Sequence, residues 1–272
     1  MKSINILMII SLLLIAGCLN ESSNVEWKFF KKIKLDNISP TGIAIQHNFI
    51  WLSDVKNNRV VKTDLSGNFI EEYSNIKRPM HISIFNSKIF IPEYLTDKLK
   101  VISESKIDSI LLKEKPNAPS GVSLNDSLIA IADFYNHRII LQGKNKITII
   151  GKEGHNKGEL YYPTDVVLIN DKIYVADAYN NRVQVFDLEG KSLQIIGEKD
   201  CINVAAGIEL TDKYIFVTDF EGNRILIYNL EGILIKILIN NLDKPIDISF
   251  NNKLLLVLNY GNKSISMYNN NL

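Results

Sequence analysis

Three side chains that could bind a cation each stand two residues after a proline: His81, Asp165 and Asp247. Imidazole nitrogens and carboxylate oxygens are common ligands of divalent cations. The equivalent positions of three further segments carry glycine, so polar side chains alternate with glycine. If all these positions face one axis, the three side chains would surround it with pseudo-threefold spacing and could bind a cation or a polar ligand group. The alternative is that each aspartate caps the start of its own strand.

A second set of residues suited to binding is aromatic. One or two positions after a residue that ends a strand, the chain carries Tyr94, Phe134, Tyr135, Tyr179, Phe220 and Tyr260. Aromatic rings supply a large contact area at low entropy cost. Exposed together, these rings would suit capture of a peptide, a glycan or a partner protein. The alternative is that some of them plug a central channel or cover a neighbouring repeat.

The spacing of both sets comes from an internal repeat. Proline or alanine is followed fourteen positions later by an acidic residue or Asn at six places: Pro40 with Asp54, Pro79 with Glu93, Pro119 with Asp133, Pro163 with Asp177, Ala205 with Asp219, and Pro245 with Asn259. Successive partners lie 39, 40, 44, 42 and 40 residues apart. A period of about 40 residues is typical of propellers and solenoids, because one unit cannot bury its own apolar faces. Six repeats in register predict a six-bladed β-propeller.

Each repeat has the pattern of four short strands. Apolar side chains alternate in the first strand, as in residues 120–124, and form a short run in the second, as in residues 173–176. Alternation with period two indicates strands. Four of the turns that follow the second strand carry an Asp and, five residues later, an Arg. An Asp can accept hydrogen bonds from the turn and pair with the Arg, so we expect these acids to be structural.

The last repeat has room for only three strands before the sequence ends at residue 272. The missing strand is expected at the other end of the chain, where residues 27–35 are rich in aromatic and β-branched side chains. A strand from one end that completes the last blade would close the ring and remove exposed sheet edges. We therefore predict an all-β fold, a six-bladed propeller of four-stranded blades over residues 27–272, closed in a three-plus-one arrangement.

The repeats resemble those of the NHL-repeat family of β-propellers. The resemblance spans residues 27–268 and is strongest over residues 149–187, which include the runs IIGKEG, GEL, PTDV and YVADAYNNRVQVFD. Repeats two and six depart from it, with Glu93 and Asn259 at the place of the turn Asp. The resemblance implies a propeller whose first-strand starts and second-strand ends share one rim. It does not choose a function, because such propellers bind proteins or RNA, act as sensors and occasionally serve as lyases.

The N-terminal residues have the pattern of an export signal. Lys2 precedes a mostly apolar stretch over residues 4–17, which is shorter than the roughly 20 residues that a membrane-spanning helix needs. The stretch runs into Ala16-Gly17-Cys18, which resembles the bacterial lipobox. We predict a lipoprotein signal peptide over residues 1–17, and a lipidated Cys18 with a short tether over residues 18–26. The alternatives are an ordinary signal peptide with an incidental Cys18, or an uncleaved anchor.

Charge and cysteine content constrain the partners and the compartment. Lys and Arg number 31 against 30 Asp and Glu, so the net charge is +1, and no nucleic-acid partner is expected because such binders usually carry a basic face. The only other cysteine, Cys201, cannot form an internal disulfide with a lipidated Cys18. We expect Cys201 to be a small buried or half-buried residue.

Together these patterns predict a binding or scaffold propeller, exported and anchored by lipid in the cell membrane or outer membrane, facing the periplasm or the exterior. Its rim, formed by the loops after the second strands, would recognise a protein, peptide or glycan partner. The alternative is a metal-dependent enzyme of the lactonase or lyase type that uses His81, Asp165 and Asp247 at the channel mouth. The sequence carries no Ser-His-Asp, CxxC or glycine-rich phosphate motif, so we assign no catalytic residue, and no cofactor besides the divalent cation of this alternative.

Overall fold

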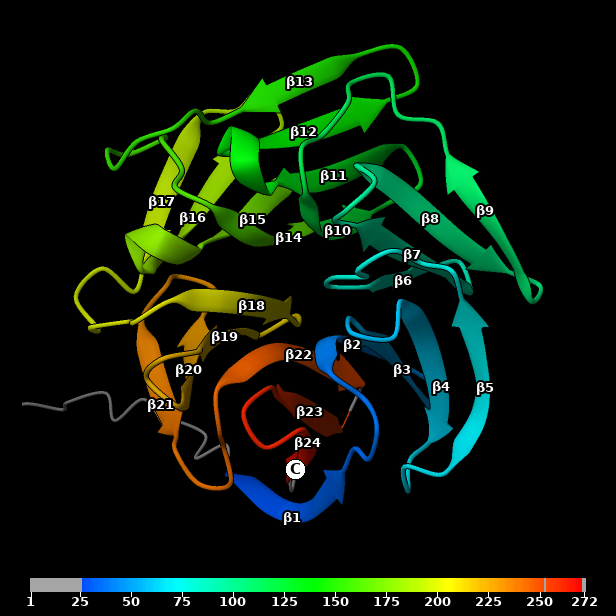
Figure 1. Ribbon diagram of the computed structural model, residues 1–272. Helices are drawn as coiled ribbons and strands as arrows, with labels where there is room; N and C mark the ends of the chain where they lie inside the picture. The colour runs from blue at the N-terminus through cyan, green and yellow to red at the C-terminus, as the bar shows by residue number, and fades with distance from the viewer. Residues whose placement is uncertain (1–25, 252, 271–272) are drawn as a thin grey trace, which may run out of the picture.

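The computed structural model describes residues 26–251 and 253–270 as a ring of six blades around a central axis (Figure 1). Each blade is a four-stranded antiparallel sheet, and the only helical elements in these ranges are two single-turn 3-10 helices. The predicted all-β, six-bladed fold is confirmed. Within the same ranges, no helix has the length and apolar character needed to cross a membrane. The predicted signal peptide, Cys18 and most of the tether lie outside the described residues.

The blades follow one another in chain order, and each is built from its innermost strand outward. Blades 1 and 2 are β2 (Pro40–Gln46), β3 (Phe49–Asp54), β4 (Arg59–Asp64), β5 (Phe69–Ser74), and β6 (Ser83–Phe85), β7 (Lys88–Glu93), β8 (Lys98–Ser103), β9 (Lys106–Ile110). Blades 3 and 4 are β10 (Pro119–Leu124), β11 (Leu128–Asp133), β12 (Arg138–Gly143), β13 (Ile147–Ile150), and β14 (Pro163–Ile169), β15 (Lys172–Asp177), β16 (Arg182–Asp187), β17 (Ser192–Ile196). Blades 5 and 6 are β18 (Ala205–Leu210), β19 (Tyr214–Asp219), β20 (Arg224–Asn229), β21 (Leu234–Leu238), and β22 (Pro245–Asn251), β23 (Leu254–Asn259), β24 (Ser264–Asn270), β1 (Trp27–Lys34).

The ring closes through its N-terminal strand. β1 pairs antiparallel with β24, from Trp27 opposite Asn270 to Lys34 opposite Ser264. The buried Trp27 ring contacts Phe216 of blade 5 edge-on, with 5.3 Å between the ring centroids. β1 therefore completes blade 6 and also packs against blade 5, which confirms the predicted three-plus-one closure.

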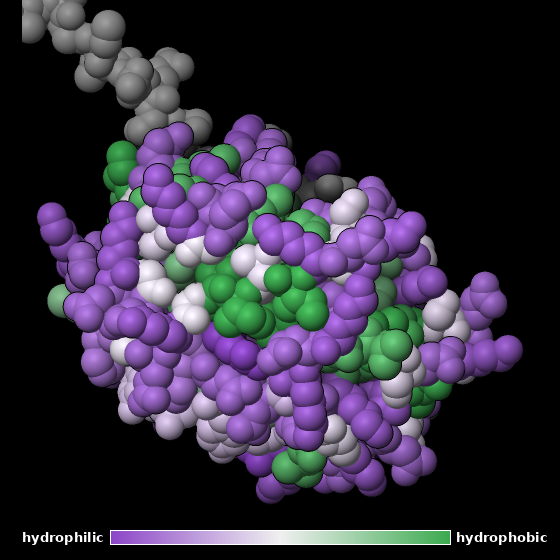
Figure 2. Space-filling model, turned by 90° about the horizontal axis from the view of Figure 1, so that it is seen from above, coloured by the Kyte–Doolittle hydropathy of each residue, from purple (hydrophilic) through white to green (hydrophobic). Residues whose placement is uncertain are grey.

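The core lies between neighbouring blades. In β15, Ile173 to Ala176 are all buried, because one face of the sheet packs on blade 3 and the other on blade 5. Packing on both faces explains why second strands are apolar runs and do not alternate. On the outer side of the ring, hydrophobic side chains gather between hydrophilic ones, as Figure 2 shows for the edge that is uppermost in Figure 1.

The acidic residues that end the second strands hold the turns together. Asp177 is fully buried and accepts hydrogen bonds from the Tyr161 N–H at 2.7 Å, from Arg182 Nε at 2.9 Å and from Gln184 Nε2 at 3.0 Å. The Asp–Arg pairs of blades 1, 3 and 5 have the same geometry. In blade 2, Glu93 accepts from a backbone N–H and from Thr96 instead. These carboxylates are structural, as their spacing predicts.

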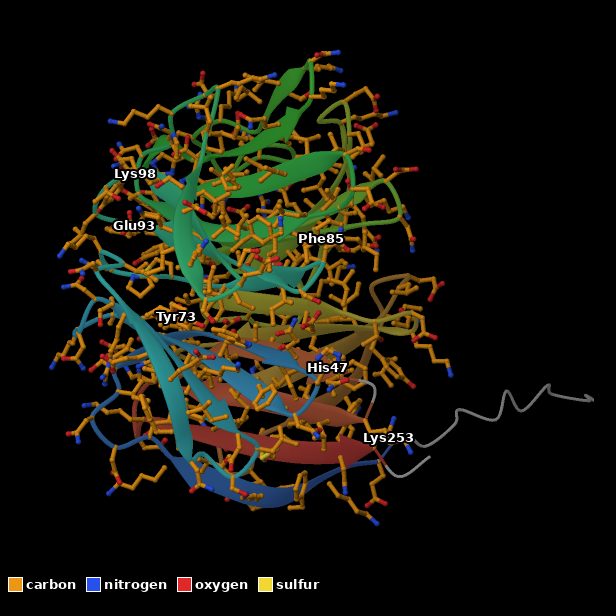
Figure 3. The ribbon with its side chains drawn as sticks, turned by 90° about the vertical axis from the view of Figure 1, so that its right-hand side faces the viewer. His47, Tyr73, Phe85, Glu93, Lys98 and Lys253 are labelled. Carbon is orange, nitrogen blue, oxygen red and sulfur yellow. The ribbon has the colours of Figure 1, made fainter. Side chains whose placement is uncertain are left out.

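The ring has two faces, which Figure 3 shows from the side. The turns between second and third strands, such as Glu93 to Lys98, lie on the face that we call the rim face. The turns near His47, Phe85 and Lys253 lie on the opposite face, which we call the base face. β24 starts at a rim-face turn and ends at the base face, so β1, which runs antiparallel to it, begins at the base face.

The expectation that Cys201 is buried is wrong. Cys201 is exposed and has a φ of 52°, in the loop between β17 and β18. The next residue, Ile202, fills the core between blades 4 and 5. The loop therefore turns one side chain inward and leaves the thiol at the surface.

Candidate functional site

The structure brings His81, Asp165 and Asp247 together at the axis of the ring. One potential ligand atom from each residue lies within 4.8 Å of the other two, and all three side chains are buried. They come from blades 2, 4 and 6, and the equivalent positions of blades 1, 3 and 5 are glycines. The alternation seen in the sequence is thus a ring of alternating polar residues and glycines around the axis, which we call the axial triad.

The alternation has a steric cause. A Cβ at Gly121 would lie 2.7 Å from the Cα of Asp165, and one at Gly207 would lie 2.9 Å from the Cα of Asp247. The backbone that carries each aspartate therefore approaches the preceding blade too closely for any side chain there. Glycine in one blade is what allows the polar residue of the next blade to reach the axis.

A proline in the neighbouring strand interrupts the strand pairing beside His81. In blade 2 the opening Pro79 pairs with Glu93, but regular pairing resumes only at Ser83, opposite Phe90. Pro92, which lies between these pairs on β7, has no N–H to donate to a ladder. The Pro92 carbonyl accepts from the Met80 N–H at 3.1 Å, and the His81 N–H donates to the Ser120 carbonyl of blade 3 at 3.0 Å. His81 is therefore positioned by the neighbouring blade as well as by its own.

Backbone N–H groups from two blades fix each aspartate of the axial triad. Asp165 accepts from the N–H of Val166 at 2.8 Å and from that of Ile208 in blade 5 at 3.0 Å. Asp247 accepts in the same way from Ile248 at 2.8 Å and from Ile43 in blade 1 at 2.7 Å. Each carboxylate caps its own strand and also joins its blade to the next one.

His81 lies between the two carboxylates without a completed hydrogen bond. Its Nδ1 is 3.3 Å from Asp247 Oδ1 and 3.6 Å from Asp165 Oδ2, and it is buried with no hydrogen-bond partner among the described residues. Burial lowers the pKa of His81, but the charges of Asp247 and Asp165 raise it more, to about 10. The arrangement therefore favours a positive charge at this point, supplied either by a proton on the imidazole or by a cation in its place.

A small cavity adjoins the axial triad. Its volume is about 220 Å³, room for roughly seven water molecules, and its wall includes Ser83, Ser123, Glu209 and Ser249. Glu209 accepts hydrogen bonds from the N–H groups of Leu210 and Phe250, and burial raises its pKa to about 8. Sequence reasoning missed Glu209. It lies two residues after Gly207 on β18, and residues two apart on a strand point to the same side, so the spacing was an available signal. A cavity of this size accepts water, an ion or a small group, and excludes a macromolecule.

On the rim face, aromatic rings from blades 2 to 4 form a continuous surface that we call the aromatic cluster. Its members are Tyr94, Phe134, Tyr135, Tyr161, Tyr162 and Tyr179. Neighbouring centroids lie 5.8 Å apart between Tyr94 and Tyr135, and 5.2 Å apart between Tyr162 and Tyr179. The sequence pattern missed Tyr161 and Tyr162, which precede a strand instead of following one; the pair of adjacent tyrosines before Pro163 was the available signal.

Hydrogen bonds and ring contacts fix the backbone of the aromatic cluster. Tyr162 has a φ of 52° and donates its N–H to Nδ1 of His137 at 3.0 Å. The His137 ring stacks on Tyr161 at 5.1 Å, and the Tyr179 N–H donates to the Tyr161 carbonyl. At the other end, the Arg78 guanidinium lies 4.5 Å from the centroid of Tyr94. These contacts leave the rings of Tyr135 and Tyr179 exposed on a preformed support.

The remaining rim aromatics form a separate pair. Phe220 and Tyr260 lie 6.0 Å apart over blades 5 and 6, and no ring contact within the described ranges joins them to the aromatic cluster. Blade 1 has Val55 at the equivalent turn position. Four of the six predicted rim aromatics therefore join the aromatic cluster, and the other two form this separate pair.

Comparison with known proteins agrees with this architecture. Residues 160–186, which cover the first three strands of blade 4, match the NHL repeat. The chain is a six-bladed β-propeller that carries an NHL repeat. No curated protein matches the sequence.

Solved structures with the same fold include enzymes. Virginiamycin B lyase from Staphylococcus aureus is 17% identical, with a TM-score of 0.66 over 90% of this chain and 99% of that one. A streptogramin B lyase is 16% identical, with a TM-score of 0.67 over 89% of this chain and 98% of that one. A protein of unknown function from Bacteroides thetaiotaomicron is 13% identical, with a TM-score of 0.67 over 90% and 72%. At these identities the likeness concerns the fold alone.

Proposed function

We propose that the protein is a lipid-anchored, extracytoplasmic binding or scaffold propeller that recognises a protein, peptide or glycan partner through the aromatic cluster. The observation that carries this proposal is the continuous array of rings over blades 2 to 4. Aromatic anchors on a fixed backbone bind with little loss of conformational freedom, and tyrosine presents both an apolar ring and a hydroxyl.

The position of β1 supports display of the rim face. β1 begins at the base face, nine residues after Cys18. A lipid on Cys18 would hold the base face and the β1 side of the ring nearer the membrane. The rim face would then be open to a partner in the periplasm or outside the cell.

Paired tyrosine variants test the binding proposal. Tyr135→Ser with Tyr179→Ser removes two exposed rings of the aromatic cluster, and Tyr260→Ser removes a comparably exposed ring of the separate pair; Tyr179 is 56% exposed and Tyr260 is 44% exposed. We expect the double variant to reduce partner recovery from envelope extracts by about tenfold or more, and the control to leave it unchanged. Equal recovery with all three chains would contradict the proposal.

The axial triad favours a second candidate function, a metal-dependent enzyme of the lactonase or lyase type. The buried, unpartnered Nδ1 of His81 and the two carboxylates form a donor set that fits a divalent cation. The fold shared with virginiamycin B lyase is consistent with this candidate. His81, Asp165 and Asp247 would hold the cation, which would polarise a substrate carbonyl as a Lewis acid. Because the adjoining cavity is small, only a side group of a substrate would enter it.

Elemental analysis of the purified chain, prepared without chelator, separates the two candidates. Near-stoichiometric divalent metal that is lost in His81→Ala would support the enzyme and lead to lactone and lyase substrate tests. A folded chain free of metal would contradict the enzyme and leave partner binding as the function.

A further inference from the structure

Strand β1 combines exposed phenylalanines with lysines at the side of the ring where the chain enters. Four of its eight residues are lysine, and Phe29 and Phe30 are both exposed. The pairing register of β1 with β24 skips Phe30, which marks a bulge. A bulge breaks the alternation of a strand, so two successive rings can face outward where only one would otherwise do so.

The outer strand of blade 5 adds an aliphatic surface next to β1. Ile233, Ile235, Ile237 and Ile239 alternate along β21 and its flanks, and all four are exposed. A groove of about 240 Å³ separates the two strands and is lined from both sides, by Trp27 and Phe29 of β1 and by Ile237 and Ile239. A contiguous exposed apolar surface of this kind is typical of a site that contacts another protein or a membrane.

The charge of this surface is positive, in a chain whose charge is otherwise balanced. Residues 26–36 contain four lysines and two acidic residues, and Lys236 adds a fifth lysine from β21. Lys28 and Lys34 form exposed ion pairs with Glu26 and Asp36, whereas Lys32 and Lys236 form none with the described residues. The surface therefore pairs apolar side chains with uncompensated positive charge, which is the pattern of a protein surface that contacts anionic lipid.

We propose that β1 and β21 form a lipid-facing edge that lies against an anionic membrane surface. The proposal extends the predicted anchor on Cys18 but does not depend on it for its test. Nine residues reach at most roughly 30 Å, so a lipidated Cys18 would keep this edge close to the bilayer. Blade 3, at the centre of the aromatic cluster, lies on the opposite side of the ring from β1 (Figure 1). Contact through the β1–β21 edge thus turns the aromatic cluster away from the membrane.

Vesicle flotation of a chain that cannot be lipidated tests the edge directly. The mature chain, residues 18–272 with Cys18→Ser, is mixed with phosphatidylcholine vesicles, with or without about 30% phosphatidylglycerol. We expect flotation with the anionic vesicles only, and its loss in about 0.5 M salt, because screening removes the attraction of the lysines. Absence of flotation with both vesicle types would overturn the proposal.

Surface variants locate the contact. Phe30→Ser and Lys32→Glu should each reduce vesicle binding by about tenfold, whereas Ile149→Ser on blade 3 should not change it; Phe30 is 47% exposed and Ile149 is 43% exposed. Lys32→Glu replaces one exposed side chain with another and keeps the test valid if Phe30→Ser destabilises the strand. Equal losses in all three variants would overturn the proposed location.

Two further outcomes separate this proposal from its competitors. Sedimentation without vesicles should show a monomer, and a dimer that Ile235→Ser dissociates would show that a second copy covers the edge and would overturn the membrane contact. Tyr135→Ser with Tyr179→Ser should leave flotation unchanged. Failure of partner binding with intact flotation, or the reverse, therefore distinguishes the two surfaces.

Discussion

The rim turns and the axial triad both contain buried carboxylates, but they differ in the groups that remain available to a ligand. At the turns, Asp177 and the equivalent aspartates of blades 1, 3 and 5 bond to an arginine and to backbone donors, and rings such as Tyr179 beside them remain exposed. At the axis, Asp165 and Asp247 are enclosed and share one histidine that has no completed bond. The rim therefore offers a surface to a large partner, whereas the axis offers one charged position to an ion or a proton.

This difference decides which function the geometry supports better. A macromolecule can reach the exposed rings of Tyr135 and Tyr179 without any rearrangement of the ring. His81 lines a cavity of about 220 Å³, which has room for a small group only. Substitutions in the two regions should therefore differ in their effects on stability and on binding.

Removing a turn carboxylate should have the largest effect. Asp177→Ala leaves Arg182 buried without its partner and removes acceptors of Tyr161, Asn180 and Gln184. We expect the free energy of unfolding to fall by about 3–5 kcal/mol, measured by urea denaturation. Asp219→Ala is the matched control in blade 5, where the paired Arg224 is less buried, and it should cost less. A larger loss for Asp219→Ala would contradict the account of the turns.

At the axis, His81→Ala should cost less than the loss of Asp177. It removes the positive charge between two buried carboxylates, which nevertheless keep four backbone N–H donors. We expect a loss of roughly 2–3 kcal/mol in denaturant unfolding, because the carboxylates can take up protons in compensation. A loss equal to that of Asp177→Ala would show that the axial triad is as firmly structural as the turns.

Stability should fall as the pH rises, and the axial region should cause the fall. The pKa of His81 is raised from 6.5 to about 10 in the folded chain, so protonated His81 stabilises the fold fully below pH 6.5 and progressively less up to about pH 10. The raised pKa of Glu209, about 8, acts in the same direction between about pH 4.5 and 8, because an ionised Glu209 is less favourable in the fold.

The measurement is the melting temperature from pH 6 to 10 with a chelator present. His81→Gln should flatten the fall from about pH 6.5 to 10, and Glu209→Gln should reduce only the part below about pH 8. A rim variant such as Tyr179→Ser should leave the slope unchanged. A melting temperature that rises with pH over this range would contradict the assigned shifts.

The smallest expected effect on stability belongs to the exposed rim tyrosines. Tyr179→Ser removes a ring whose larger part faces solvent, so the free energy of unfolding should change by no more than about 0.5 kcal/mol. Tyr162→Ser should cost more, because that ring contacts Phe134, His137 and Tyr179. Equal losses for the two variants, by urea denaturation, would mean that Tyr179 is a structural ring and would weaken the distinction between rim and axis.

The repeat made the fold predictable, but only part of the site. A fixed spacing of fourteen residues from Pro163 to Asp177 is a pairing register, and the structure has these two residues opposite each other. The same repeat predicted that His81, Asp165 and Asp247 would meet near the axis, because equivalent residues of the blades occupy equivalent places around the ring. The spacing could not predict features that occur in one repeat only. Pro92 interrupts the strand pairing of blade 2, and Tyr162, which itself has a positive φ, joins the aromatic cluster from the loop before β14.

The sequence also could not show which of the rim aromatics would touch one another. The six turns are equivalent in backbone position, and the aromatic residues at them give no sign of which rings touch. Contact depends on rings such as Tyr161, supplied by the loop before blade 4, and on the stacked His137. These contacts depend on the conformations of individual loops, which differ between repeats and cannot be predicted from the spacing.

Photo-crosslinking in intact cells is the most direct test of the central claim that the aromatic cluster binds a partner. Benzoylphenylalanine placed at Tyr179 or at Tyr135 keeps an aromatic ring and reacts with C–H bonds of proteins, peptides or glycans alike. We expect a discrete adduct from both positions, and none from Phe69 on blade 1, which is also exposed. Adducts from Phe69 alone, or from none of the three positions, would contradict it.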